Sequence, residues 1–158
     1  MISRRRFVLG AGGVVLATPA LSGVAGAVKR YPFSLGVASG SPAPDGAVLW
    51  TRLAPDPLHG GGMAAGSTAV RYRVCRDEAM RDTVIDDQFV TDESVAHSVH
   101  AIVEGLAPGR DYWYQFYVGD DESPVGRIRT ADPSGSRVRL ALASCQSYES
   151  GYYAAYRD

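Results

Sequence analysis

The sequence predicts an all-β fold, a sandwich of two sheets, for most of the chain. Seven short segments rich in β-branched and aromatic residues follow one another from residue 33, and several alternate apolar with polar side chains. Clusters of Gly, Pro, Ser and Asp separate these segments, as turn residues separate the strands of a sandwich. The predicted strands are 33–38, 47–53, 70–76, 83–90, 95–103, 112–118 and 125–130.

Two features narrow this sandwich to a fibronectin type III-like or immunoglobulin-like module. Trp50 lies in the second predicted strand, where such modules bury a large aromatic side chain between their sheets. Leu106, Pro108, Gly109 and Tyr112 have the spacing of a tyrosine corner, in which a tyrosine near the start of a strand bonds to the backbone of the preceding turn. We therefore expect Trp50 and Tyr112 to be core anchors.

The first 27 residues have the pattern of a twin-arginine signal peptide. Arg4 and Arg5 precede an apolar, glycine-interrupted segment (7–20), and residues 25–27 supply an A-x-A cleavage site. A membrane anchor is the alternative, but the apolar segment is shorter than the roughly 20 residues that a spanning helix needs, and Pro19 interrupts it. We expect no stable membrane span, and export by the twin-arginine machinery to the periplasm, the cell surface or the medium.

Length, charge and cysteine content limit the size of the domain and the kinds of function that the rest of the chain can have. Removal of the signal peptide from 158 residues leaves about 131, enough for one domain of ordinary size. The net charge is −1 and several arginines lie in the signal peptide, so the remainder is mildly acidic, which argues against a nucleic-acid-binding surface. Cys75 and Cys145 are too few for a disulfide scaffold, although a single disulfide remains possible.

The polar residues of the sandwich have structural interpretations. His97 and His100 are three residues apart on a predicted strand, so they face opposite sides of the sheet and cannot share a metal ion. We place His97 near a sheet edge and His100 in solvent. Cys75 shares a strand face with two arginines and is interpreted as a surface thiol, and residues 120–122 as a solvated hairpin turn.

The loop 53–68 is long for a hairpin connection and contains three consecutive glycines. A phosphate-binding loop is excluded because no Gly-Lys-Ser/Thr follows, so a flexible loop is the preferred interpretation. His59 lies in this loop and receives no role. We find no serine nucleophile with a histidine and an acid at a suggestive spacing.

A different kind of segment follows a short linker, 132–136. Residues 138–143 form a continuous apolar run, typical of a strand buried on both faces of a parallel sheet, and an aromatic, alanine-rich helix start follows Gly151. Cys145 stands just past the carboxyl end of this strand, where functional groups of α/β sheets collect. By itself it is either a metal ligand whose direction the strand end fixes or a buried inert thiol.

Four short sequences carry a resemblance to a known family. They are S-C-Q followed by G-Y-Y-A-A-Y-R at the end of the chain, A-P-D-P-L-x-G-G-G-M at 54–63, V-L-W-T-R at 48–52 and G-R-I-R-T at 126–130. Together they resemble the PhoD-type alkaline phosphatases (the alkaline phosphatase D family), and the resemblance extends over essentially the whole chain after the signal peptide.

The resemblance implies a metal-dependent phosphoesterase that hydrolyses phosphate mono- or diesters with iron and calcium, in which Cys145 is an iron ligand. The implied organisation is a signal peptide (1–27), a fibronectin type III-like domain (28–131), a linker (132–136) and the start of a metallophosphoesterase domain (137–158). Because the other metal ligands of the family come from later segments, we expect the 158 residues alone to be inactive. The alternative is an exported β-sandwich that acts as a binding module.

Overall fold

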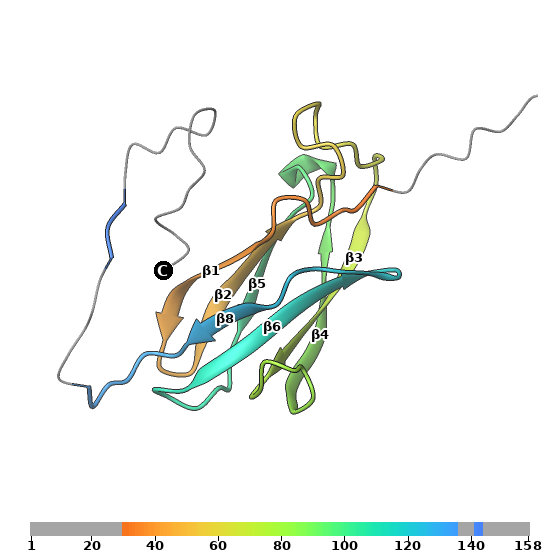
Figure 1. Cartoon of the computed structure of the whole chain (residues 1–158). Helices are drawn as coiled ribbons and strands as arrows, with labels where there is room; N and C mark the ends of the chain where they lie inside the picture. The colour runs from red at the N-terminus through yellow and green to blue at the C-terminus, as the bar shows by residue number, and fades with distance from the viewer. Residues whose placement is uncertain (1–29, 136–140, 144–158) are drawn as a thin grey trace, which may run out of the picture.

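The structure is a computed structural model, and it describes residues 30–135 and 141–143. Two antiparallel sheets face each other across a hydrophobic core (Figure 1), which confirms the predicted all-β sandwich. The elements are β1 (Val37–Ala43), β2 (Gly46–Arg52), β3 (Thr68–Cys75), β4 (Thr83–Thr91), the 3-10 helix η1 (Glu93–Val95), β5 (Ser98–Val103), β6 (Asp111–Val118), β7 (Asp121–Glu122) and β8 (Gly126–Arg129).

The pairing of the strands identifies the type of sandwich. One sheet has the order β1-β2-β5, and in the other β4 pairs with β3, β3 with β6, and both β7 and β8 with β6. In a constant-type immunoglobulin domain the fourth strand joins the sheet of the first two strands. Here β4 lies in the opposite sheet, which is the fibronectin type III arrangement.

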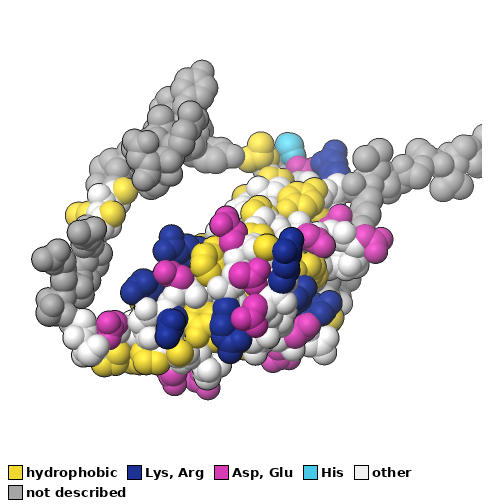
Figure 2. All heavy atoms as spheres, turned by 60° about the horizontal axis from the view of Figure 1, so that its bottom comes forward, with side chains coloured by type: hydrophobic (Ala, Val, Ile, Leu, Met, Phe, Trp, Pro, Cys, Tyr) yellow, Lys and Arg dark blue, Asp and Glu magenta, His cyan; other side chains and the backbone are white. Residues whose placement is uncertain are grey.

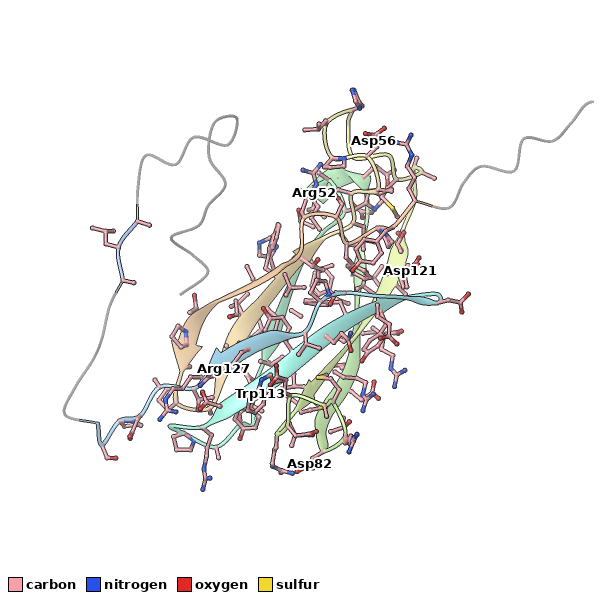
Figure 3. The ribbon with its side chains drawn as sticks, viewed as in Figure 1. Arg52, Asp56, Asp82, Trp113, Asp121 and Arg127 are labelled. Carbon is pink, nitrogen blue, oxygen red and sulfur yellow. The ribbon has the colours of Figure 1, made fainter. Side chains whose placement is uncertain are left out.

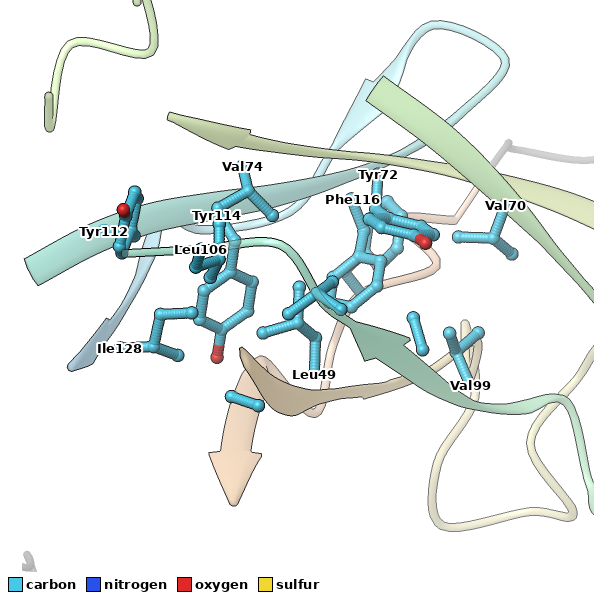
Figure 4. Close-up of a cluster of buried hydrophobic side chains, with 14 of the residues drawn as sticks. Leu49, Val70, Tyr72, Val74, Val99, Leu106, Tyr112, Tyr114, Phe116 and Ile128 are labelled. Carbon is cyan, nitrogen blue, oxygen red and sulfur yellow. The ribbon is translucent and has the colours of Figure 1, made fainter. Parts of the chain in front are cut away.

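Alternate residues of β2, β3, β5 and β6 fill the space between the sheets (Figure 4). Leu49 and Val99 enter from the first sheet and meet Val70 and Phe116 from the second. Burial of each such side chain contributes about 1.5–3 kcal/mol to folding. Gly126 is required by this packing because a Cβ atom there would collide with the ring of Tyr114.

The predicted tyrosine corner is present. Tyr112 is 4% exposed, and its hydroxyl accepts a hydrogen bond from the backbone N–H of Ala107 at 2.9 Å. Thr130 supports the same turn, since its Oγ1 donates to the carbonyl of Ala107 at 2.7 Å and accepts from the N–H of Arg110 at 3.0 Å. The corner thus ties the start of β6 to the connection that precedes it.

The prediction that Trp50 is buried between the sheets is wrong. In β2 the buried side chains are those of Ala47, Leu49 and Thr51, so Trp50 projects from the outer face and is only partly buried. Successive side chains of a strand point to opposite faces, and Leu49 takes the inward position next to it. Thr51 fixes this register, because its hydroxyl donates to the carbonyl of Gly36 at 2.8 Å.

The first strand begins later than predicted. Residues 32–35 form a turn in which the N–H of Gly36 donates to the carbonyl of Phe33, and β1 runs through 39–42, which we expected to be a turn. Pro42 is tolerated there because β1 lies at the edge of its sheet, where unpaired backbone positions need no N–H donor. A bulge between Gly40 and Ala43 accommodates Ser41, whose φ is 48°.

The apolar run after the linker is described in part. Ala141–Ala143 have no strand conformation and are exposed, and Leu142 is 98% exposed. The predicted strand is therefore absent from these three residues, which pair with no strand of the described part of the chain and so have no ladder hydrogen bonds there. The rest of the predicted strand and the helix start lie outside the described residues.

Candidate functional site

One end of the sandwich gathers the loop that follows β2, the helix η1 and Arg52 at the end of β2 (Figure 3). Asp56 organises the loop, since its backbone exchanges two hydrogen bonds with that of Gly61 at 2.8 and 2.9 Å. Its carboxylate contacts the Nδ1 of His59 at 2.9 Å and the guanidinium of Arg30 at 2.7 Å. The His59 hydrogen bond and the charge of Arg30 lower the pKa of Asp56.

These contacts give the glycine-rich loop a structural explanation. Gly60, Gly61 and Gly62 all have φ between 78° and 88°, a backbone conformation that residues with a Cβ atom rarely adopt. The loop is thus closed by its own hydrogen bonds, in contrast to the flexible loop that we expected. The role of Asp56 was missed in the sequence, although an Asp between two prolines is a common turn-forming residue.

A hollow of about 170 Å³ lies between this loop and η1. Arg52 lines it, and its Nε donates to the carbonyl of Ala96 at 2.9 Å. The carboxylate of Glu93, on the other side, accepts the N–H of Gly66 at 2.7 Å. Both charged groups are therefore engaged with the backbone, and their hydrogen bonds connect the end of β2 and the loop to η1 and its C-terminal turn.

His97 lies outside β5, contrary to the prediction that it belongs to the same strand as His100. Ala96 and His97 have φ of 53° and 54°, so the chain turns sharply before β5 begins at Ser98. His97 is 5% exposed and its Nδ1 is buried without a hydrogen-bond partner. His100 is exposed on the outer face of β5, as expected.

Cys75 is buried, so the interpretation as a surface thiol is wrong. Its Sγ lies 3.4 Å from Oγ1 of Thr83, and the thiol is free. Arg73 reaches across the end of β3 to the carbonyl of Met80 at 3.0 Å and to the hydroxyl of Thr83. The connection between β3 and β4 therefore folds back over the strand end and encloses the thiol.

The outer face of the β4-β3-β6-β8 sheet carries charges of both signs. Arg71 forms a bidentate ion pair with Asp86, and Arg127 and Arg129 both bind Asp111 at about 3 Å. Figure 2 shows how basic and acidic side chains intermingle on one face of the molecule. Exposed pairs of this kind contribute about 0–1 kcal/mol each.

No metal centre forms within the part of the chain that the structure describes. No three His, Cys, Asp or Glu side chains of residues 30–135 and 141–143 come close enough to hold an ion. These described residues therefore offer no cluster of such side chains for iron or calcium. The predicted ligand, Cys145, lies outside the described residues, as does the predicted signal peptide. Within the same described ranges, no helix has the length and hydrophobicity to cross a membrane.

Comparison with known proteins gives concordant results. The family described as PhoD-like phosphatase, N-terminal domain, matches residues 18–132. Alkaline phosphatase D of Bacillus subtilis (strain 168) is 43% identical over 167 aligned positions, which cover 98% of this chain and 29% of that protein. A solved structure of PhoD superposes with a TM-score of 0.76 at 48% identity, over 82% of this chain and 25% of that one.

A fibronectin type III domain of the human collagen alpha-1(XX) chain, at 16% identity, covers 85% of this chain and 99% of its own length. Its TM-score of 0.36 is too low to support an argument. The assignment rests on the matches to the phosphatases, of which this chain spans between a quarter and three tenths of the length. The chain belongs to the PhoD-like phosphatase family, and its β-sandwich is the N-terminal domain of that family.

Proposed function

We propose that this chain is the amino-terminal part of an exported, metal-dependent alkaline phosphatase or phosphodiesterase that hydrolyses phosphate esters. The observation that supports the proposal is the 43% identity to alkaline phosphatase D over 98% of the chain. Because so little of the chain is left unmatched, the matched region includes Cys145. The relationship therefore extends past the sandwich into the segment where we place the start of the phosphoesterase domain.

In this proposal Cys145 is a ligand of iron, and calcium completes the phosphate-binding centre. A thiolate suits a transition metal, and bound metal ions supply charge that stabilises the transition state of phosphoester hydrolysis. One thiolate cannot form such a site, so the other ligands come from segments beyond residue 158. Among the described residues of the sandwich, no three His, Cys, Asp or Glu side chains gather into a site of their own.

A hybrid protein tests the proposal. Residues 28–158 are joined to the matching remainder of Bacillus subtilis alkaline phosphatase D, and hydrolysis of p-nitrophenyl phosphate and of its bis-ester is measured with iron and calcium supplied. We expect metal-dependent turnover by the hybrid and only background hydrolysis by residues 28–158 alone. Turnover by the short chain would contradict our assignment of the missing ligands.

The two cysteines offer a matched pair of variants for the same hybrid. Cys145→Ala should abolish iron binding and most of the activity, whereas Cys75→Ala should leave both unchanged because Cys75 is enclosed in the sandwich. Equal iron content in the two variants would remove Cys145 from the site. A hybrid without metal-dependent turnover would instead favour the alternative, an exported binding module.

Export has a separate test in cells. We propose that Arg4 and Arg5 direct the precursor to the twin-arginine machinery, since a pair of arginines before a moderately apolar segment is the address that this route recognises. Changing both residues to Lys should retain the precursor inside the cell. Normal processing of the double-Lys precursor would show that another route exports it.

A further inference from the structure

The outer face of the β1-β2-β5 sheet carries a small apolar surface centred on Trp50. Two rows of cross-strand neighbours form it, Gly40, Val48 and Ile102 in one row and Ala38, Trp50 and His100 in the other. Ile102 is 69% exposed, and Trp50 is partly exposed next to Ala38, its neighbour on β1. We call these six residues the Trp50 surface.

The composition of the Trp50 surface is that of a contact surface. An exposed aliphatic side chain beside a partly buried tryptophan resembles the centre of a protein interface, where Trp is enriched and charged residues are depleted. The outer face of the opposite sheet has the reverse character, since Arg71, Asp86, Asp111 and Arg127 form exposed ion pairs there. Burial of the Trp50 surface in a contact would therefore desolvate fewer charged groups than burial of the opposite face.

The path of the chain brings its continuation to the Trp50 side. After β8 the chain leaves the second sheet, and the N–H of Ala131 donates to the carbonyl of Ala43 at the end of β1, at 3.0 Å. Asp132 then caps a turn by accepting the N–H of Ser134 at 2.9 Å. The linker thus starts beside the edge of the first sheet and in a folded conformation.

The dimensions are compatible with a contact. A five-residue linker spans at most about 17 Å when extended, and less with a turn in it. Along β1, Gly40 is three residues and Ala38 five residues from Ala43, which corresponds to about 10 and 17 Å at the rise of a strand. A domain that begins at residue 137 is therefore held within reach of the Trp50 surface.

We propose that the Trp50 surface is the docking site of the domain that begins at residue 137 and continues the chain. The inference rests on the proposed function, which supplies that domain. The contact uses the face of the sheet and not the edge of β1, because Pro42 and the bulge at Ser41 interrupt the hydrogen-bonding pattern that an added strand requires.

Oxidative footprinting with hydroxyl radicals tests the docking, and the two tryptophans of the chain serve as probe and control. Trp50 and Trp113 are both partly exposed, on the outer faces of opposite sheets. In residues 28–158, whose sandwich encloses a core of its own, both are oxidised. In the hybrid described above, we expect oxidation of Trp50 to fall about fivefold, since a docked surface excludes water, and oxidation of Trp113 to stay the same.

Two surface variants sharpen the test. Ile102→Glu in the hybrid should restore the oxidation of Trp50 to the level of the short chain, because a charge would have to be buried in the contact. Val90→Glu is the control, since Val90 is 58% exposed on β4 in the other sheet, and it should change nothing. Circular dichroism of residues 28–158 checks that both variants fold.

The results separate the two proposals. A hybrid that hydrolyses phosphate esters but leaves Trp50 as reactive as in the short chain overturns the docking inference alone. A hybrid without activity in which Trp50 is protected and Ile102→Glu removes the protection supports the docking and contradicts the proposed function. Protection of Trp113 in place of Trp50 assigns the contact to the opposite sheet and overturns the inference.

Discussion

At the scale of single residues, the hydroxyl oxygen of Tyr112 makes a hydrogen bond whose contribution to stability can be measured. Tyr112→Phe removes the hydroxyl and leaves the N–H of Ala107 without its partner, so we expect a loss of about 1–3 kcal/mol in the free energy of unfolding. Tyr31→Phe is the control: Tyr31 is 45% exposed, and removal of its hydroxyl should lower the free energy of unfolding by no more than about 0.5 kcal/mol. Urea melts of residues 28–158 measure both. Equal losses would mean that the corner bond does not stabilise the sandwich.

Leu49 and Trp50 give a second residue-scale prediction. Leu49→Ala should cost about 2–5 kcal/mol because it leaves a cavity between the sheets. Trp50→Ala should cost only about 1 kcal/mol in residues 28–158, since the side chain lies on the outer face. The comparison is made by urea denaturation of the two variants. A larger loss for Trp50→Ala would restore the core position that the sequence suggested.

Single residues also show where sequence reasoning succeeds. Tyr112 could be predicted because the corner depends on local spacing within one turn. Trp50 could not be placed by its size, since a shift of one residue along β2 exchanges the two faces, and the hydroxyl of Thr51 that fixes the register bonds to a residue 15 positions away. Cys75 is buried by a connection whose path the strand pattern does not describe.

At the scale of elements, the turn between η1 and β5 has two consecutive non-glycine residues with positive φ, Ala96 and His97. Ala96 adopts φ of 53°, which costs an alanine about 1–2 kcal/mol. Ala96→Gly should therefore raise the free energy of unfolding by about 0.5–1 kcal/mol, after the greater entropy of an unfolded glycine is included. Thermal and urea melts check the sign.

The control for this turn is Ala69→Gly on β3. Ala69 is exposed within a regular strand, so the glycine relieves no strain there and should destabilise the protein by about 0.5–1 kcal/mol. Opposite signs for the two alanine-to-glycine changes would support the strained turn. A loss of stability in both variants would show that the conformation of Ala96 is not costly.

The strands illustrate what the sequence pattern determines. The alternation of apolar and polar residues predicts β2, β3, β4, β5, β6 and β8 to within a few residues of their observed bounds. It does so because a half-buried strand needs one apolar face. β1 was displaced because it is an edge strand with small, exposed residues and no periodic apolar signal. The segment 138–143 was predicted as a strand from its apolar character alone, yet Ala141–Ala143 lack any strand to pair with.

At the scale of the whole molecule, the sandwich encloses a hydrophobic core of its own. Asp56, Asp86 and Asp111 are engaged in ion pairs with arginines, and no metal-binding cluster forms among the described residues. In the proposed enzyme, hydrolysis therefore depends on the segment that contains Cys145 and on the domain that this segment begins. In the docking that we propose, the sandwich holds that catalytic part in place through the Trp50 surface.

The stability of residues 28–158 should also depend on pH. On the acid side, hydrogen bonds from Ser94 lower the pKa of Asp92, and those from Arg71 lower the pKa of Asp86. A carboxyl whose pKa is lower in the folded state stabilises the fold above its unfolded value, about 3.9, and loses that contribution as pH falls further. The urea midpoint should therefore decrease below about pH 4.

On the alkaline side, burial raises the pKa of Tyr72 and Tyr114. A tyrosine whose pKa is higher in the folded state stabilises the fold fully below its unfolded value, about 10, and loses that contribution as pH rises further. Urea midpoints should thus stay level from about pH 5 to pH 9.5, a range that includes the alkaline conditions of the proposed activity.

Asp92→Asn, which keeps the oxygen that caps η1, should reduce the loss of stability at low pH and leave the loss at alkaline pH unchanged. An equal acid loss in Asp92→Asn and in the parent would show that this carboxylate does not contribute to it.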